Sequence, residues 1–598
     1  MQGMRSRLTR GRAAAAGVIV TIGVACSSRE GGFDGPPGDF GRQDPAEAGS
    51  DACEGLRCSR DLKKVLSSCD DRVIEECGPG QGCGEGACVD GCTAAALSKG
   101  SAGCSFWTLP PDSATEGQQG SCYAALLANT WEQPVTISAA HGADALDITR
   151  STFLLEGAGT GVTYTRLEGA LAPGQVAIVF LAGTPNAKYP CPAAVEPAVK
   201  EDPILHGTAR TKAFRLMTSA PVSAYSIFPY GGAGSQIPAA TLLLPVTSWS
   251  TNYLAVSPMP GFEAKDIAGQ YRRRTSLQLV ADEDETEIRI LPKADISDGI
   301  GLTGSARGAA ATWTLGRGEV VQITQLDELT GSAVVSNKPI GMFGGAECHN
   351  IPTTMSFCDA LHQQIPPLSS WGSEYALVPY RPRVSAGLEK AVPWRFVGAV
   401  DGTVLNYDPE RPPEAPVTLA AGEVATFMTN RIVSVKSQDA EHPFYAAVYM
   451  TGSMYNSTSG IPGRTLGDPD YVNVVPSDQF LDRYVFFTDH TYSTTTLTIV
   501  RRRTPSGFLP VELGCAGAVG DFKPVGENGD YEYAWVTLTD HFQPQRFDGG
   551  ECGYGRHEAK SEGSFSLTVW GIDLDASYGY PGGMGLRPIT TIEAPVPR

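Results

Sequence analysis

The side chains best suited to catalysis or metal binding in this sequence are eight histidines, and their spacing favours neither. They form no H-E-x-x-H or H-x-H pair, and the sequence has no G-x-S-x-G elbow, Walker loop or strand-linked G-x-G-x-x-G. His349 and His362 could meet a metal ion together with Asp359, but a histidine satisfied within a loop is the more common case. Acidic turns at 282–285 and 468–470 could hold Ca²⁺ through oxygen ligands, although such acids usually face water. We therefore expect no catalytic residue, no metal ion and no cofactor.

A short loop between Cys348 and Cys358 is the segment that we expect to form a recognition surface. It is inserted between the last strand of one repeat and the first aromatic residue of the next, and a disulfide would hold its shape. A loop that is ordered in advance loses less entropy on binding. The alternative is that the disulfide only staples a long connection. The candidate binding residues are His349, Asn350, Ile351, Pro352 and Phe357.

The cysteine count indicates an oxidising compartment. There are 15 cysteines, and setting Cys26 aside leaves an even number that can all form disulfides. Zinc is the alternative for the dense N-terminal group, but that group has no histidine and no repeated C-x2-C spacing. The dense group consists of Cys53, Cys58, Cys69, Cys77, Cys83, Cys88, Cys92 and Cys104. The other six pair by neighbourhood as Cys122 with Cys191, Cys348 with Cys358, and Cys515 with Cys552.

The N-terminus has the pattern of an export signal. Four arginines up to Arg12 precede an apolar run over 13–25, which is too short to span a bilayer as a stable helix. The run ends in Gly-Val-Ala-Cys26, which resembles a bacterial lipobox, where the signal is cleaved and the cysteine is acylated. Ser27 behind it implies sorting to the outer membrane. We predict an outer-membrane lipoprotein on the periplasmic or surface face, in contact with the membrane only through its lipid.

A stretch that occurs three times organises the rest of the chain. The copies at 245–253, 367–375 and 476–484 each have a proline, a large aromatic residue four positions later and a tyrosine four positions after that. An apolar strand follows each copy. The copies are spaced like small domains, and a chain of 598 residues is too long for one core. We interpret the recurring aromatic residues as buried anchors for these strands.

The fold class predicted for this body is all-β. Short runs rich in Val, Ile, Thr, Tyr and Phe alternate with Gly, Pro, Asn and Asp, with little helical periodicity. We expect about four repeated units that are either β-sandwich-like or arranged as a closed, propeller-like ring of large sheets sealed by the tail at 589–592. A small disulfide-rich module, either a stalk or a recognition knob, precedes them.

The predicted domain organisation follows from these features. It comprises a signal peptide (1–25), a flexible tether (26–52), a cysteine-rich module (53–104), β units at 105–240, 241–362, 363–472 and 473–582, and a C-terminal tail (583–598).

One block of the sequence resembles a known family. The run over 326–345, followed by Cys348-His-Asn-Ile-Pro352, Cys358-Asp359 and the stretch over 363–372, is similar to the N-terminal domain of IgG Fc-binding proteins. The likeness extends from about Tyr123 to Pro581. The order of tether, cysteine module and body is similar to surface lipoproteins of predatory or soil-dwelling Gram-negative bacteria, the myxobacterial type. The resemblance implies an extracellular binding or adhesive role, but it carries over no residue that contacts antibody.

These features favour a non-catalytic binding or adhesion lipoprotein at the cell surface, with an extracellular protein or glycan as its ligand. The formal net charge of −19 argues against a nucleic-acid partner, which would require clustered basic residues. Two alternatives remain open. One is a secreted hydrolase whose acids and histidines converge only in the folded chain, and the other is a structural part of the envelope.

Overall fold

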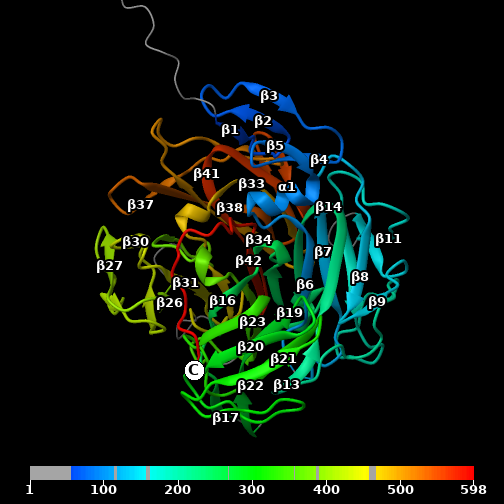
Figure 1. Ribbon diagram of the computed structural model, residues 1–598, viewed down its shortest axis with the longest axis vertical. Coiled ribbons are helices and arrows are strands. Elements are labelled where there is room, and N and C mark those ends of the chain that lie inside the picture. The colour runs from blue at the N-terminus through cyan, green and yellow to red at the C-terminus, as the bar shows by residue number, and fades with distance from the viewer. Residues whose placement is uncertain are drawn as a thin grey trace, which may run out of the picture. The chain divides into compact units, whose positions relative to one another are not determined.

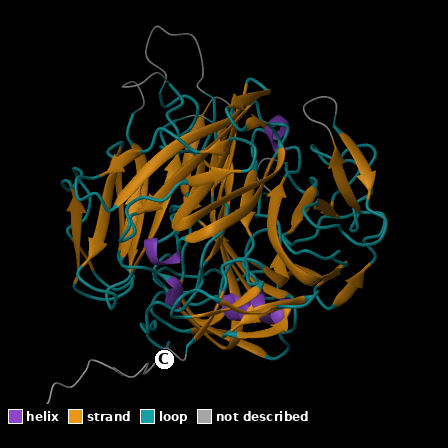
Figure 2. Ribbon diagram, turned by 90° about the horizontal axis from the view of Figure 1, so that it is seen from above, coloured by secondary structure: helices purple, strands orange, loops and turns teal. Residues whose placement is uncertain are grey.

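The structure is a computed structural model that describes residues 55–113, 117–156, 162–266, 269–355, 357–384, 390–456 and 466–597. Strands make up nearly all of its regular structure and the helices are short (Figure 2). The predicted all-β fold is therefore confirmed. The predicted signal peptide and tether, with Cys26 and Cys53, lie outside the described residues.

The cysteine-rich module is small and held by disulfides. Its only α-helix, α1 (Gly91–Ser98), is capped by the Asp90 side chain, which accepts from the Thr93 backbone N–H at 3.0 Å. The disulfides Cys58–Cys83, Cys77–Cys88 and Cys92–Cys104 link its strands, and Cys69 is also disulfide-bonded. The strands form one three-stranded sheet, β1 (Leu56–Cys58), β2 (Lys64–Ser67) and β3 (Val73–Glu76), and one hairpin, β4 (Gln81–Gly84) and β5 (Ala87–Asp90).

The first large sheet is built on one long strand, β14 (Phe214–Phe228). Its pairing with β6 shifts register between Met217 and Val222, and Pro221 lies in this interval, where its missing N–H costs no ladder bond. The other strands are β6 (Gly103–Thr108), β7 (Tyr123–Asn129), β8 (Ile137–His141), β9 (Asp144–Leu146), β10 (Thr152–Glu156), β11 (Thr163–Arg166), β12 (Val176–Ala182) and β15 (Ala239–Leu242).

The second sheet is built in the same way on β23 (Ala333–His349). Its first half pairs with β16 and β20, and its second half pairs with β19 and β24. The other strands are β13 (Ala209–Lys212), β16 (Ser250–Leu254), β19 (Thr275–Ala281), β20 (Thr286–Leu291), β21 (Ala311–Leu315), β22 (Glu319–Gln325) and β24 (Asp359–Ile365). A separate hairpin is formed by β17 (Phe262–Asp266) and β18 (Gly269–Arg273).

The third unit divides into two four-stranded sheets. One contains β25 (Glu374–Leu377), β27 (Thr403–Asp408), β28 (Thr418–Leu419) and β30 (Val433–Ser437). The other contains β26 (Val392–Gly398), β29 (Val424–Thr429), β31 (Phe444–Met450) and β32 (Asp470–Asn473).

The fourth sheet has ten strands around β41 (Gly555–Asp573). The others are β33 (Leu481–Thr488), β34 (Thr494–Arg502), β35 (Val511–Leu513), β36 (Gly517–Ala518), β37 (Lys523–Val525), β38 (Tyr531–Asp540), β39 (Gln543–Phe547), β40 (Gly550–Cys552) and β42 (Ala576–Pro581).

Four inner strands, one from each unit, close a ring. β15, β24, β32 and β42 each pair with a longer strand of their own unit, and each also contacts the inner strands of both neighbouring units. Gln363 on β24 is fully buried, and its Nε2 donates to Ala240 O on β15 at 3.0 Å and to Gly579 O on β42 at 2.9 Å. On the other side of β24, Asn473 Nδ2 on β32 donates to Gln364 O at 2.9 Å. Of the two arrangements that the sequence left open, the closed ring of sheets is the one these contacts describe.

The hydrophobic cores lie between neighbouring units. One core combines Phe180 and Tyr225 of the first sheet with Phe486 and Leu497 of the fourth. A second combines the second sheet with Tyr449 and other residues of the third. Each sheet therefore buries apolar side chains against its neighbours, which explains why the body, together with the module, forms one compact unit from Glu54 onward.

The three repeated stretches lie at one end of this ring, which we call the tail end, and there they share one local structure. In each copy a 3₁₀ helix precedes the aromatic residue: η4 (Val246–Ser248), η5 (Leu368–Ser370) and η6 (Ser477–Gln479). The tyrosine hydroxyl then accepts from the backbone N–H three residues earlier and donates to a carbonyl of the same unit. For Tyr375 these partners are Gly372 N at 3.2 Å and Phe444 O at 2.5 Å, and Tyr253 and Tyr484 repeat the arrangement.

The C-terminal tail and the cysteine module cover the tail end. The tail leaves β42, pairs with the module through Leu586 N and Lys99 O at 2.6 Å, and reaches η5 through Ile589 N and Ser369 O at 2.8 Å. It ends beside β16, where Ala594 N donates to Asn252 Oδ1 at 2.9 Å. The module also reaches the fourth sheet through an ion pair of Arg60 with Asp482 at 3.2 Å. Figure 1 shows the strands of the module next to β33 and β41. The chain therefore closes its own ring at this end.

Candidate functional site at the loop end of the ring

The opposite end of the inner strands, which we call the loop end, gathers four connections. They are the residues that lead into each inner strand: 229–238, 349–358, 451–469 and 574–575, as far as the structure describes them. Ile237 of the first loop packs on Cys348 and Cys358 of the second. Gly452 N of the third donates to Ile351 O at 2.7 Å. The loop from the cysteine pair thus has neighbours from two other units.

The Cys348–Cys358 disulfide forms, but it turns most of the predicted binding residues inward. His349, Asn350 and Ile351 are at most 2% exposed, and Pro352 and Phe357 are half-buried. Asn350 Nδ2 donates to Met355 O at 2.8 Å and to Phe357 O at 3.1 Å, which folds the loop onto itself. These residues therefore shape the loop, and its exposed tip is Thr353–Thr354. Burial of this kind could not be read from the loop's sequence.

The histidines of this loop do not assemble a metal site. His349 lies edge-on to the Phe262 ring at 5.1 Å, and burial, with smaller contributions from Arg395 and Arg273, lowers its pKa to about 3. His362 Nε2 faces Gln278 Oε1 at 2.8 Å, and burial lowers its pKa to about 3 as well. Asp359 instead accepts from Ser577 N at 3.2 Å. Among the described residues, no three His, Cys, Asp or Glu side chains converge as metal ligands.

Four buried carboxylates lie behind the loops. Asp359, Asp468, Asp470 and Asp575 are each at most 1% exposed. Burial raises the pKa of Asp359 well above its usual range, and Asp468 and Asp470 raise it further. Burial likewise raises the pKa of Asp470. These acids do converge in the folded chain, but as they stand no bulky substrate can reach them.

Apolar side chains are exposed in two of the four loop-end connections, and no feature of the sequence analysis singled them out. Met454 is 37% exposed and Leu574 is 47% exposed. They belong to one region, because Ser453 Oγ donates to Asp575 Oδ1 at 2.7 Å. Phe542, which is 45% exposed, extends it, because Phe542 N donates to Ser493 O and Ser493 N donates to Asp573 Oδ2. Exposed Met, Leu and Phe side chains are typical of protein-binding surfaces.

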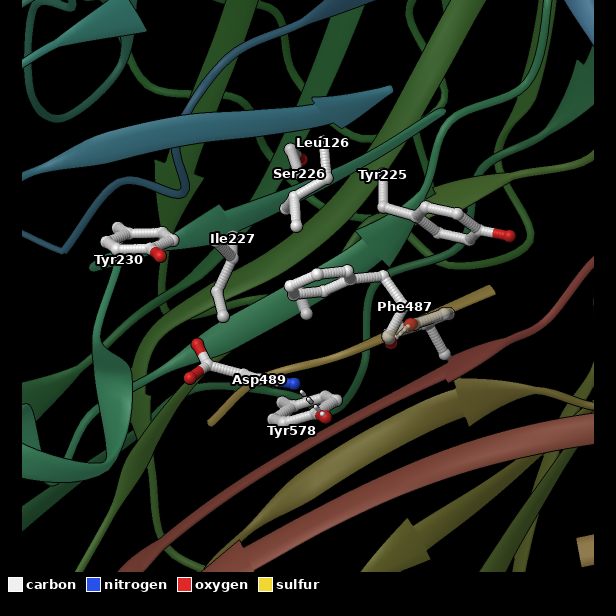
Figure 3. A pocket seen from close by; sticks show the side chains of 10 residues that line it. Leu126, Tyr225, Ser226, Ile227, Tyr230, Phe487, Asp489 and Tyr578 are labelled. Carbon is white, nitrogen blue, oxygen red and sulfur yellow. Dashed lines mark hydrogen bonds between the residues drawn. The ribbon is translucent and has the colours of Figure 1, made fainter. Parts of the chain in front are cut away.

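A narrow cavity opens between the first and fourth sheets near the same end (Figure 3). Its walls come from β14, β15, β33 and β42, and tyrosines dominate them. Burial, and then the charge of Asp489, raises the pKa of Tyr230, Tyr492 and Tyr578. These phenols therefore stay neutral around a buried carboxylate. The sequence analysis missed this cavity because its residues are hundreds of positions apart.

The remaining predicted cysteine pairs are disulfides of the body. Cys122–Cys191 joins the residue before β7 to the segment after β12, and Cys515–Cys552 joins the turn after β35 to the end of β40. His557 lies beside the second of these, with Nδ1 3.6 Å from Cys515 Sγ, and burial lowers its pKa to about 4. Both disulfides connect the cysteines that neighbourhood alone had paired.

Most of this ring matches a known protein family. No helix among the described residues is long and apolar enough to span a bilayer. No curated protein matches the chain. Residues 239–571 match a protein family described as IgGFc binding protein, and the match begins at β15 and ends within β41. Because it covers more than half of the 598 residues and three of the four units, this chain belongs to the IgGFc binding protein family.

Proposed function

We propose that this chain is an exported, non-catalytic binding protein that recognises an extracellular protein through its loop end. The observation that carries the proposal is the set of exposed apolar side chains at the loop tips, Met454, Leu574 and Phe542, at the end of the ring that the tail does not cover. A glycan ligand would instead be expected to need exposed polar groups around an aromatic platform.

The loop end is also ordered in advance. The Cys348–Cys358 disulfide, the bonds of Asn350 within its loop and the bond from Gly452 to Ile351 hold two of its loops together. A partner that binds here pays little additional ordering entropy. The family description, IgGFc binding protein, supports a protein as the partner and makes antibody Fc one candidate.

An exported location fits the chemistry of the chain. Its disulfides would be reduced in the cytosol, and we propose that Cys26 carries a lipid that anchors the chain to an outer membrane. The test is metabolic labelling with a radioactive fatty acid in a Gram-negative host. Label should enter the wild-type chain and be absent from the Cys26→Ser variant, and equal labelling of both would contradict the anchor.

Binding is tested on the soluble Cys26→Ser chain with two matched double variants. Met454→Ser with Leu574→Ser alters the loop end, and Val404→Ser with Val417→Ser alters equally exposed apolar residues of the third unit. The chains are captured on a biosensor and exposed to IgG Fc, to a panel of other extracellular proteins, and to a glycan array. We expect the loop-end variant to weaken binding of a protein ligand by about tenfold or more, while the control variant binds as before.

Three results would contradict the proposal. Equal loss in both variants would indicate non-specific adhesion. Loss only in the Val404/Val417 variant would move the site to the third unit. Binding confined to the glycan array would replace a protein partner with a glycan.

The hydrolase alternative receives less support. The carboxylates that converge, Asp359, Asp468, Asp470 and Asp575, are at most 1% exposed, whereas a pair of catalytic acids has to flank its substrate.

A further inference from the structure

The cavity between the first and fourth sheets contains one carboxylate, Asp489, of which only one oxygen accepts hydrogen bonds from the described residues. Asp489 is 3% exposed, and its Oδ1 accepts from Thr491 N and Thr491 Oγ1, both at 2.8 Å. Its Oδ2 is buried and accepts no hydrogen bond from any described residue. The nearest ionisable group paired with it is His490, with Nδ1 3.7 Å from Oδ1. A buried carboxylate oxygen in this situation is costly unless a donor or a cation reaches it.

The walls of the cavity are aromatic. Figure 3 shows the Asp489 carboxylate on the side of the cavity where Tyr230 and Ile227 lie, whereas the Asp489 backbone N faces Tyr578. Tyr578 is held in place because its hydroxyl accepts from Asp489 N at 3.1 Å. The Tyr225 hydroxyl lies within hydrogen-bond distance of two carbonyl oxygens, Val485 O at 2.6 Å and Gly582 O at 2.9 Å, and can donate its one proton to either. Faces of tyrosine and phenylalanine rings attract cations, and they do so most strongly where water is excluded.

The volume of the cavity and the chemistry of its lining limit the kinds of cation that could bind there. The centre of a water molecule could occupy about 20 Å³ of this cavity. A space of about 10–15 Å³, measured in the same way, holds one water. Ca²⁺ and Mg²⁺ take six or more oxygen ligands, and this cavity has one carboxylate and Ser226 among aromatic and aliphatic side chains. An ammonium group needs fewer oxygens, because ring faces can take the place of hydrogen-bond acceptors.

We propose that this cavity binds an alkylammonium group of the size of methylammonium, with Asp489 Oδ2 as the anionic partner, the Tyr230 hydroxyl as a second acceptor and aromatic rings as the remaining wall. The group belongs either to a free small amine or to the end of a lysine side chain on a partner protein. The inference does not depend on the apolar loop tips, so it can fail or succeed independently of the proposed protein-binding surface.

The first test uses the full chain carrying Cys26→Ser and needs no change in the cavity. Thermal unfolding and calorimetry are measured with methylammonium, tetramethylammonium, potassium and sodium chlorides at one ionic strength. We expect methylammonium alone to raise the unfolding temperature and to bind saturably, because tetramethylammonium is too large and the metal ions lose their hydration at an aromatic wall. Equal responses to methylammonium and potassium would overturn the proposal.

The second test changes the carboxylate. Asp489→Asn removes the charge and keeps the shape, whereas the control Glu168→Gln removes an exposed charge elsewhere on the first sheet. We expect Asp489→Asn to weaken methylammonium binding by about tenfold or more and Glu168→Gln to leave it unchanged. Methylammonium binding that is equal in wild type and Asp489→Asn would overturn the proposal, as would a crystal soaked in methylammonium that shows only water beside Asp489.

Two peptides distinguish the possible sources of the ammonium group. Gly-Lys-Gly and its norleucine counterpart are compared on the same chain. Binding of Gly-Lys-Gly, with no binding of the norleucine peptide, supports capture of a lysine side chain. Binding of methylammonium with no binding of either peptide supports a free amine.

Discussion

The tail end and the loop end of the ring are made from the two ends of the same four inner strands, yet they are finished differently. At the tail end, three copies of one sequence stretch bury an aromatic residue, and the C-terminal tail and cysteine module cover them. At the loop end, four connections of different sequence meet, with exposed apolar tips and buried acids beneath. Repetition marks the end that the tail and the module cover, and variation marks the end at which we propose that a partner binds.

The contrast has a chemical basis. At the tail end the repeated tyrosines make neutral hydrogen bonds, such as those of the Tyr375 hydroxyl with Gly372 and Phe444. The loop end keeps acidic side chains out of water, including Asp359 and Asp489. A region built for stability avoids unsatisfied polar atoms, whereas functional regions commonly retain them.

We expect the largest loss of stability from a substitution at the tail end, and it would test the contrast between the two ends. Trp371→Ala removes a side chain that is 2% exposed and packs on Tyr445 with ring centroids 5.4 Å apart. Loss of such a residue should lower the free energy of unfolding by about 3–5 kcal/mol. Urea unfolding followed by circular dichroism measures it. A loss below about 1 kcal/mol would mean that the repeated aromatic residue is not a structural anchor.

We expect the Cys348–Cys358 disulfide to contribute less to stability than Trp371 does and more to partner binding. Replacing Cys348 and Cys358 together by serine should lower the free energy of unfolding by about 2–4 kcal/mol, because the unfolded loop is no longer constrained. Partner binding should weaken as well, since the loop must then be ordered on association. The Cys122/Cys191 double serine variant is the control, because it removes a disulfide outside the loop end. If both pairs reduce binding equally, the loop end is not distinctive.

The buried acids should make the loop end the part that responds to pH. The pKa of Asp359 is raised in the folded chain, so folding favours its protonated form, and the free energy of unfolding falls as pH rises above the usual carboxyl value. Asp359→Asn keeps an acceptor for Ser577 N and removes this titration. The variant should therefore gain stability relative to wild type between about pH 5 and about pH 8, as measured by urea unfolding. A difference that stays constant over this range would show that Asp359 is not protonated in the fold.

The smallest effect on stability is expected at the loop tips. Met454→Ser with Leu574→Ser should change the free energy of unfolding by at most about 0.5 kcal/mol, because both side chains are substantially exposed. The same variant is expected to lose the most in partner binding. Thermal unfolding beside the biosensor measurement checks both statements, and a large loss of stability would place these residues in the core instead.

Much of the strand pattern was predictable from local sequence. Short runs rich in β-branched and aromatic residues predicted an all-β body, and β20 and the first half of β23 are runs of this kind. The inner strands were not predicted. β15 and β32 have four residues each, too few to show a period, and they are stabilised by strands of neighbouring units.

The domain boundaries illustrate the same limit. Boundaries placed before 241, 363 and 473 fall within β15, β24 and β32. Each of these strands pairs with its own unit and contacts the next, so the covalent order of the chain contains no clear break there. The candidate loop was identifiable from Cys348 and Cys358, but the burial of most of its predicted binding residues was not.

By itself the sequence determined the strand-rich fold, the recurrence of one anchor stretch and the neighbour pairs of cysteines, because each depends on residues close together in the chain. Only the tertiary structure decided that the sheets close a ring, that the tail covers one end, and that Asp489 meets tyrosines from two sheets. The reason is that burial and charge depend on contacts between distant segments. Tyr225 and Tyr578, which share one cavity, are brought together only when the first and last sheets meet.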